Sequence, residues 1–348
     1  SVSDRPPIFP VCIDWHSTMY QASEDRYLFR VEENEYSFYN SELVLLDPST
    51  TGNIKFGLEC SNNVIARFEL QIFPINEEYN DFRIIQINPD KPVHVLYGRQ
   101  EVDLEKFFYD YTPEIWFADG SVLEGSALSK LQEDTEPYPR DKIISWDWTG
   151  VNLRSESQGV DPKITDSIQY RCIENLKKQD YDIIYDDDYS GEIADIITIK
   201  KTDTRILVEL YHLKWAIEGR ISKEIKNLYE VCGQAQKSIH WKFKEGRELV
   251  EHLLRRQTKS YMGKQCPRLA KGTEQDLRNL LKLAKHNLPL EFKIYIVQPA
   301  IPKLDATQEQ LTLLGVTETY LREKAQIELA VIGSDGTVKR QAKAKRSP

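Results

Sequence analysis

The residues Gly191-Glu192-Ile193-Ala194-Asp195-Ile196 and, further along the chain, Tyr211-His212-Leu213-Lys214 decide the predicted fold. The first stretch opens an apolar run that contains one carboxylate. The second closes an apolar run with an imidazole and an ammonium group. Residues 200–204 between the two runs are polar and typical of a turn. We therefore predict two neighbouring strands, 192–199 and 205–214, joined as a hairpin.

Helices and strands are expected on both sides of this hairpin. Apolar residues recur at helical spacing before it, and apolar runs of strand length follow it between further helical stretches. The predicted elements in chain order are a helix 164–178, strands 181–185, 192–199 and 205–214, a helix 224–241 with more helix up to residue 283, a strand 291–298, a helix 306–324 and a strand 326–332. The order is α-β-β-β-α-(α)-β-α-β.

The N-terminal part of the chain has a different pattern, in which short apolar or alternating runs are separated by loop clusters. The predicted strands include 27–31, 42–46, 63–73 and 82–87, with one helix at 103–111. Evenly spaced strands of this kind indicate a sandwich-like or barrel-like β domain. The chain is thus expected to be α+β or α/β. Its predicted parts are a β-rich domain 1–131, a linker 132–145, a second domain 146–337 and a basic tail 338–348.

The charge is distributed unevenly along the 348 residues. The whole chain has 46 basic and 55 acidic side chains, a formal net charge of −9. Residues 1–140 contain 11 basic and 25 acidic side chains, a balance of −14, whereas residues 211–290 contain 17 and 8, a balance of +9. An acidic module beside a basic one is typical of proteins in which one part meets a polyanion.

Composition argues against several other classes. No apolar run approaches the roughly 18 residues of a membrane helix, and the first residues have no signal-peptide core. The five cysteines are widely spread and include no CxxC pair, so neither a disulfide framework nor a thiolate zinc site is indicated. We expect a cytoplasmic protein without a membrane partner.

Strand alternation predicts where the chemistry lies. Asp195 is a single carboxylate within an apolar strand, and His212 and Lys214 share one face of the next strand. An acid, an imidazole and an ammonium that converge on neighbouring strands suit phosphodiester hydrolysis. Hard oxygen ligands would hold Mg²⁺ or Mn²⁺ at the phosphate, and a lysine would offset negative charge or orient the water.

The two stretches resemble the PD-(D/E)xK nuclease superfamily, whose αβββαβ core has an Asp on its second strand and a (D/E)-x-K on its third. Asp195 and Lys214 match this pattern, and His212 stands where the third-strand acid is expected. The resemblance implies a restriction-endonuclease-like fold, DNA as substrate and Mg²⁺ or Mn²⁺ as cofactor. Asp195 and His212 are the implied metal ligands, and Lys214 would orient the water.

The helix that follows supplies further candidates. Glu230, Gln234 and Lys237 lie on one polar stripe, and Gly233 within the helix indicates close packing on the sheet beside it. Because the superfamily often places a Gln on this helix, Gln234 is the implied positioning residue. Glu192 and Glu230 are candidates to complete the ligand set that His212 leaves short of an acid.

A narrower resemblance is to a nuclease-like module that accompanies bacterial superfamily 2 helicases, some of them in phage-defence loci. The matching residues are Asp166 to Gln169, Gly191 to Ile196, Tyr211 to Lys214 and Leu228 to Ser238. The resemblance implies a helicase or ATPase partner and a role in anti-phage defence. The chain has no GxxxxGK[ST] loop, so such a motor would lie on another chain or outside this one.

A basic stretch follows the Gln-bearing helix and is interleaved with Trp241, Phe243 and Tyr261. Phosphate contacts from such side chains give salt-dependent affinity without sequence readout. The predicted nucleic-acid-binding residues are Lys237, Lys242, Lys244, Arg247, Arg255, Arg256 and Lys259.

Three alternatives stay open at this stage. The module is either an active nuclease or a catalytically inactive DNA-binding and partner-docking relative, because His212 replaces an acid. The acidic turn 186–188 is either a solvated hairpin or a source of one more metal ligand, Asp187 or Asp188. The acidic N-terminal domain is a candidate DNA mimic or protein-docking surface.

Overall fold

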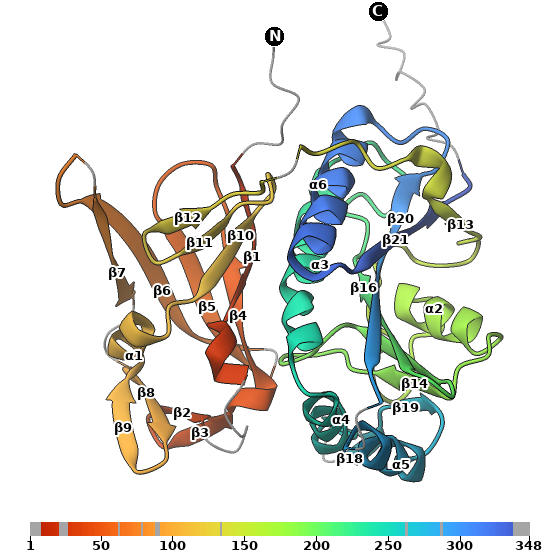
Figure 1. Ribbon diagram of the computed structural model, residues 1–348, viewed down its shortest axis with the longest axis horizontal. Helices are drawn as coiled ribbons and strands as arrows, with labels where there is room; N and C mark the ends of the chain where they lie inside the picture. The colour runs from red at the N-terminus through yellow and green to blue at the C-terminus, as the bar shows by residue number, and fades with distance from the viewer. Residues whose placement is uncertain are drawn as a thin grey trace, which may run out of the picture.

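The computed structural model describes residues 8–20, 27–61, 63–77, 79–87, 91–132, 134–261, 264–285 and 288–336. They form a mixed α+β molecule in which sheets dominate, and its two halves lie side by side (Figure 1). None of the helices in these ranges is long and apolar enough to cross a membrane.

The N-terminal half consists of three antiparallel four-stranded sheets around one core. Their strand orders are β1-β10-β11-β12, β3-β2-β8-β9 and β4-β5-β6-β7. In β2 the residues Tyr27, Phe29 and Val31 are buried and the two between them are half-buried, as strand alternation requires. The elements are β1 (Pro10–Asp14), β2 (Tyr27–Val31), β3 (Asn34–Ser37), β4 (Ser41–Leu46), β5 (Ile54–Cys60), β6 (Asn63–Pro74), β7 (Asn80–Gln86), β8 (Val93–Tyr97), β9 (Gln100–Asp103), α1 (Leu104–Asp110), β10 (Glu114–Phe117), β11 (Val122–Glu124) and β12 (Ala127–Ser129).

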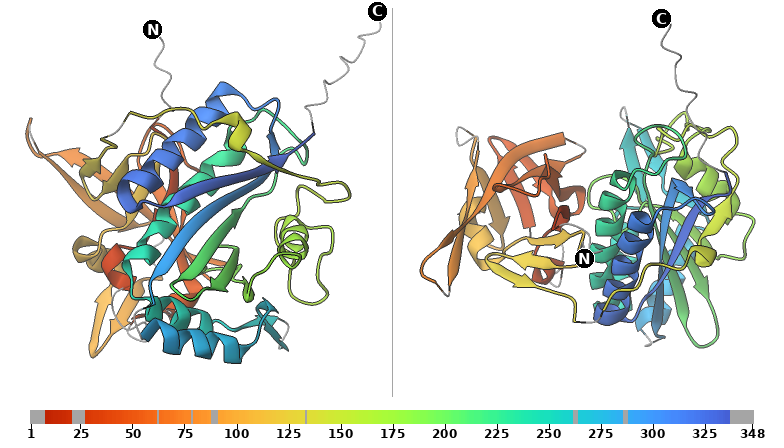
Figure 2. Two further views of the ribbon diagram at one scale, coloured as in Figure 1. Left: turned by 45° about the vertical axis from the view of Figure 1, so that its right-hand side comes forward. Right: turned by 90° about the horizontal axis from the view of Figure 1, so that it is seen from above.

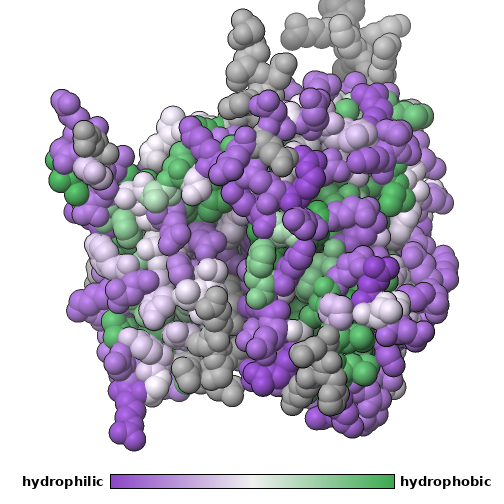
Figure 3. All heavy atoms as spheres, in the orientation of Figure 1, coloured by the Kyte–Doolittle hydropathy of each residue, from purple (hydrophilic) through white to green (hydrophobic). Residues whose placement is uncertain are grey.

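The long β6–β7 hairpin projects from this half (Figure 1). Its tip is rich in apolar side chains, which appear as green spheres among polar ones in Figure 3. Ile75 and Tyr79 are 63% and 64% exposed.

The C-terminal half contains a seven-stranded mixed sheet with the order β13-β21-β20-β16-β15-β14-β19. β14, β15 and β16 pair antiparallel, whereas β20 and β21 continue the sheet parallel to β16. The strands are β13 (Ile144–Trp146), β14 (Ile183–Asp186), β15 (Ile196–Lys201), β16 (Ile206–Leu213), β19 (Leu269–Lys271), β20 (Leu290–Pro302) and β21 (Glu328–Ser334).

Helices cover both faces of this sheet. α2 (Ile168–Leu176) packs on one face through Ile168, Cys172 and Leu176. α3 (Lys226–Lys237) and α6 (Gln308–Ala325) pack on the other, between the sheet and the N-terminal half (Figure 2). The apolar residues that predicted the helix 164–178 are thus buried on the sheet at Ile168, Cys172 and Leu176.

The helix α3 also packs against the N-terminal half. A Cβ atom on Gly233 would lie 2.5 Å from Cys12 Cβ and 2.9 Å from the carbonyl oxygen of Val11, both in β1. Trp116 Nε1 in β10 donates to the Tyr320 hydroxyl in α6 at 2.9 Å. One apolar core thus continues from the C-terminal sheet into β1 and β10. The close packing at Gly233 is therefore with β1 of the N-terminal half and not with the C-terminal sheet that the sequence indicated.

Two predicted elements differ from the structure. The second strand begins at Ile196, so Asp195 lies in the turn before it. The continuous helix expected up to residue 283 is interrupted after α4 (Gly246–Arg255) by β17 (Thr258–Tyr261), β18 (Lys264–Pro267) and β19, and resumes as α5 (Glu274–Lys285). Pairing of β19 with β14 at the sheet edge is a long-range interaction that helix periodicity does not report.

The predicted linker packs against the C-terminal half. Tyr138 is buried, and its backbone N–H donates to the Leu311 carbonyl of α6 at 2.8 Å. β13 then pairs with β21. The domain boundaries stay predictions, and the predicted tail 338–348 lies outside the described residues.

Replacing Gly233 with alanine tests the contact between α3 and β1. In an open helix this change stabilises by roughly 1 kcal/mol. Here the added methyl group meets the β1 backbone, so we expect a net loss of about 1–3 kcal/mol in the free energy of unfolding, measured by urea denaturation. A Gly233→Ala protein that is more stable than the wild type would contradict this packing.

Candidate metal site

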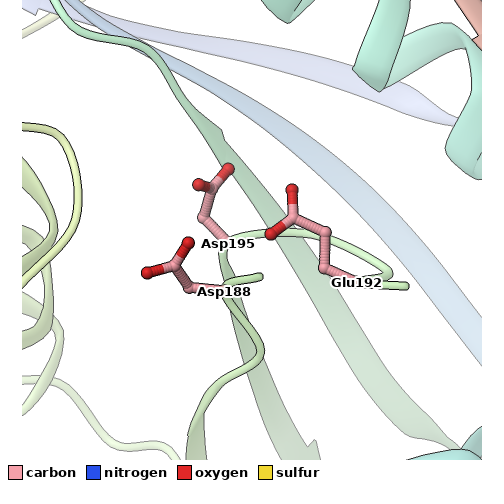
Figure 4. A group of neighbouring side chains, drawn as sticks. All are labelled: Asp188, Glu192 and Asp195. Atoms are coloured by element: carbon pink, nitrogen blue, oxygen red, sulfur yellow. The ribbon is translucent and has the colours of Figure 1, made fainter. Parts of the chain in front are cut away.

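Three carboxylates meet at the turn between β14 and β15. Asp188 and Glu192 belong to that turn, and Asp195 is its last residue. Their carboxylates gather on one side of it (Figure 4), where one oxygen of each lies within 4.8 Å of the others. Asp195 is buried, and the other two are half-buried. The predicted residues Asp195 and Glu192 thus come together, and Asp188 joins them.

Asp195 is held in place from two sides. Its Oδ2 accepts a hydrogen bond from the Leu213 backbone N–H at 2.8 Å, at the end of β16. Its backbone carbonyl accepts one from Gln169 Nε2 in α2 at 3.2 Å. The carboxylate is therefore fixed against the third strand even though Asp195 itself lies outside a strand.

The electrostatics of this group fit a bound cation. Burial and the neighbouring charges of Glu156 and Asp188 raise the pKa of Asp195 well above its usual value. Burial and the charges of Asp195 and Asp188 do the same to the pKa of Glu192. A divalent cation stabilises the ionised form of clustered carboxylates, and this stabilisation matters most where their pKa values are raised. Carboxylate oxygens are also the ligands that Mg²⁺ and Mn²⁺ prefer. Asp188, Glu192 and Asp195 therefore fit the predicted metal.

Lys214 directly follows β16 and lines the same cleft as the cluster. Its Nζ donates to Glu230 Oε1 of α3 at 2.6 Å and to Glu156 Oε1 at 3.4 Å. Burial opposes its positive charge, but the carboxylates of Glu156 and Glu230 outweigh burial and raise the pKa of Lys214. Lys214 is thus positively charged, and two carboxylates hold its ammonium group in position.

Glu156 is a site residue that the sequence reasoning missed. It comes from the long loop before α2, and its Oε2 accepts the Trp215 backbone N–H at 2.6 Å. Burial raises the pKa of Glu156, and the charge of Lys214 partly offsets this. No spacing rule connects a loop glutamate to a lysine on a strand that is distant in sequence, so only the fold brings them together.

Two buried arginines hold the turn that carries the cluster. Arg256 Nε donates to Asp187 Oδ1 at 2.7 Å, and its other nitrogens bond the backbone carbonyls of Asp187, Tyr189 and Ser190. Arg268 Nη1 bonds the carbonyl of Asp188 at 2.8 Å. Of the two acids left open by the sequence, Asp187 is thus used in an ion pair and Asp188 is in the cluster.

The structure does not bring His212 to the carboxylates, which corrects its prediction as a metal ligand. Its Nε2 lies 3.1 Å from Ser238 Oγ, and Nδ1 is buried without a hydrogen-bond partner among the described residues. Burial lowers the pKa of His212 to about 3. The prediction for His212 assumed that Asp195 lies in a strand and shares a face with His212. Because Asp195 lies in a turn, strand alternation does not place the two side chains together.

The polar stripe of α3 is divided among different roles. Gln234 and Glu230 line the cleft beside the cluster. Lys237 lies between the halves, where burial opposes its charge but Asp14, Glu42 and Glu192 raise its pKa. It therefore balances acids at the interface and also lines the cleft, so its role as a DNA contact stays a prediction.

The other predicted DNA contacts do not form one free basic surface. Arg256 is buried in the ion pair with Asp187, Lys242 donates to the Ala325 carbonyl at the end of α6, and Lys244 lies over the Trp241 ring. Arg247 is exposed between two glutamates at 3.9 Å, and Arg255 is exposed. The side chain of Lys259 lies outside the described residues. The closeness of these residues in the sequence therefore predicted a larger basic surface than the fold forms.

The cluster opens into a cleft of about 890 Å³ between the two halves. Its C-terminal wall contains the cluster, Lys214 and Glu230, and its N-terminal wall is formed by parts of β1 and β4. A site between the halves was absent from the sequence analysis, which placed the chemistry in the C-terminal domain alone.

The chemistry of this cleft has to be inferred from its own residues. Comparisons of the chain with protein-family models, with curated proteins and with solved structures found no match. The resemblance to PD-(D/E)xK nucleases therefore remains a prediction.

Removing Arg256 tests the role of the ion pair with Asp187. An Arg256→Met protein leaves the buried Asp187 facing Arg268 at 3.8 Å in place of the 2.7 Å pair with Arg256, so we expect a loss of about 3–5 kcal/mol in the free energy of unfolding. The matched control is Arg99→Met, an exposed arginine in the turn between β8 and β9, with an expected change within about 0.5 kcal/mol. Equal effects of the two substitutions in urea denaturation would contradict the assigned role.

Divalent metal binding is testable through stability. At 100 times its dissociation constant, Mn²⁺ should stabilise the chain by about 2.7 kcal/mol, and Asp195→Asn should remove this gain while Asp203→Asn, on an exposed turn, keeps it. Because the raised pKa values of Asp195 and Glu192 leave protons for the cation to displace, the gain should increase with pH. A gain that is independent of pH or of Asp195 would contradict the assigned ligands.

Proposed function

We propose that the chain is a divalent-metal-dependent nuclease that hydrolyses DNA phosphodiesters in the cleft between its halves. The observation that carries this proposal is the carboxylate group Asp188, Glu192 and Asp195, which shares one cleft with the fixed cation Lys214. The order α2-β14-β15-β16-α3-β20, disregarding the insertion between α3 and β20, agrees with the αβββαβ order that the resemblance implies. The PD-(D/E)xK assignment belongs to this proposal.

The residues divide the work as their contacts suggest. Asp195, Glu192 and Asp188 would hold Mg²⁺ or Mn²⁺, which supplies Lewis-acid activation of the phosphate and of water. Lys214 places a permanent positive charge beside the developing negative charge. Its two carboxylate partners, Glu156 and Glu230, hold it in orientation.

Gln234 has a positioning role in this proposal. Its side chain reaches the cleft, and its Oε1 is buried without a hydrogen-bond partner among the described residues. A buried amide oxygen without a partner is costly and is typical of groups that bind a ligand or water. The helicase partner and the role in anti-phage defence remain predictions from sequence.

A cleavage assay with linear and circular DNA, each offered as single strand and as duplex, tests the proposal. We expect cleavage of at least one of these forms with Mg²⁺ or Mn²⁺, none with EDTA, and a loss of at least about 100-fold in Asp195→Asn and Lys214→Met. Lys223→Met, which changes an exposed lysine outside the cleft, is the matched control and should keep full activity.

The inactive alternative predicts a different result in the same assay. DNA that is bound but not cleaved with either cation would overturn the nuclease proposal and favour a DNA-binding and partner-docking module. Equal activity of the Asp195→Asn and wild-type proteins would contradict the assignment of Asp195 as a metal ligand and would overturn the proposed site.

A further inference from the structure

We propose that the cleft accepts single-stranded DNA and excludes the double helix, because the N-terminal half forms its second wall. The inference rests on the proposed function, since it names the substrate form for that same cleft. It is carried by three observations: where the walls touch, which aromatic side chains line the cleft, and how its charge is arranged.

The two walls are in contact on more than one side of the cleft. Ser190 Oγ, next to the cluster, donates to Glu59 Oε1 of the N-terminal half at 3.0 Å. On the side of α3, Gly233 lies directly against β1. A volume of about 890 Å³ suits a few nucleotides. A duplex, whose major groove alone is about 12 Å wide, would have to separate these contacts to bring a phosphate to Asp195.

Aromatic rings line the cleft from both halves. Phe9 precedes β1 and lies 4.7 Å, between ring centroids, from Tyr229 of α3. Tyr189 directly follows Asp188, and all three rings contribute to the cleft. Aromatic platforms of this kind stack unpaired bases, whereas the bases of a duplex are already stacked on each other.

The backbone at Tyr189 supports a role for its ring. Its φ of +89° is uncommon for a side chain of this size and costs about 1–3 kcal/mol. The bonds from Arg256 to the Tyr189 and Ser190 carbonyls hold this conformation. Such strain is typical of functional sites, and here it places an aromatic residue next to the carboxylates.

The charge of the cleft determines how a strand would be bound. Its carboxylates outnumber its lysines, seven to three, so phosphates are repelled unless cations are present. A bound metal and the exposed Lys226 at the start of α3 offer contacts to the backbone. Base stacking on the aromatic rings then has to supply a large part of the binding affinity. Unpaired bases can stack on these rings, whereas the paired bases of a duplex cannot.

Binding of 2-aminopurine-labelled DNA tests the inference. The full chain is titrated into a labelled 20-nucleotide strand and into the blunt duplex of the same sequence, with Ca²⁺ replacing Mg²⁺ to slow hydrolysis. We expect quenching of the single strand and at least about tenfold weaker binding of the duplex. Tyr229→Leu and Phe9→Leu should each weaken single-strand binding at least about fivefold. Tyr229→Phe should retain it.

The control is Tyr79→Leu, which changes an exposed tyrosine on the β6–β7 hairpin outside the cleft and should bind like the wild type. Thermal melting of each variant verifies folding, and Tyr229→Leu, compared with Tyr229→Phe, keeps the test valid if the Phe9 variant unfolds. Duplex binding as tight as single-strand binding would overturn the inference. So would a single-strand preference that neither Tyr229→Leu nor Phe9→Leu changes.

Cleavage by the same proteins with Mg²⁺ or Mn²⁺ separates this inference from the nuclease proposal. Metal-dependent cleavage of duplex and single strand at equal rates would overturn the substrate form and leave the nuclease standing. Tyr229-dependent binding of single strands without any cleavage would overturn the nuclease and leave the single-strand site standing.

Discussion

The close approach of α3 to β1 is the contact on which the rest of the structure depends. Gly233 has no side chain, so the helix lies against the β1 backbone with its other face on the central sheet. One helix therefore belongs to two layers, and the halves share a core. Because this contact holds the halves in register, the cleft between them has fixed walls and the carboxylate cluster faces β4.

Two kinds of acidic group lie within a few residues of one another in the β14–β15 turn. Asp187 is buried and compensated by Arg256, so it stabilises the turn. Asp188, Glu192 and Asp195 lie close together, and burial together with their mutual repulsion raises the pKa of Asp195 and Glu192. The ion pair between Asp187 and Arg256 holds the turn in a shape that the mutual repulsion of these three carboxylates opposes.

Much of the fold could be predicted from the sequence, because the spacing of apolar residues and the residues typical of turns are local features of the chain. The strand 27–31 coincides with β2, and the predicted third strand 205–214 contains β16. The hairpin around the acidic turn was also predicted. The strand β19 was missed because its partner β14 is remote in sequence. The strands β17 and β18 pair with each other and were missed because the composition of this stretch is typical of a helix.

The sequence by itself determined that Asp195, Glu192 and Lys214 belong to two neighbouring segments of one hairpin, because apolar runs fix those strands whatever surrounds them, but it placed Asp195 within the strand 192–199 and not in the turn before β15. Only the tertiary structure decided which side chains join them. Asp188 and Glu156 reach the site through loops, while His212 and Arg256 are buried elsewhere. Loop paths and burial depend on packing between distant segments, above all between α3 and β1, and no local pattern encodes that packing.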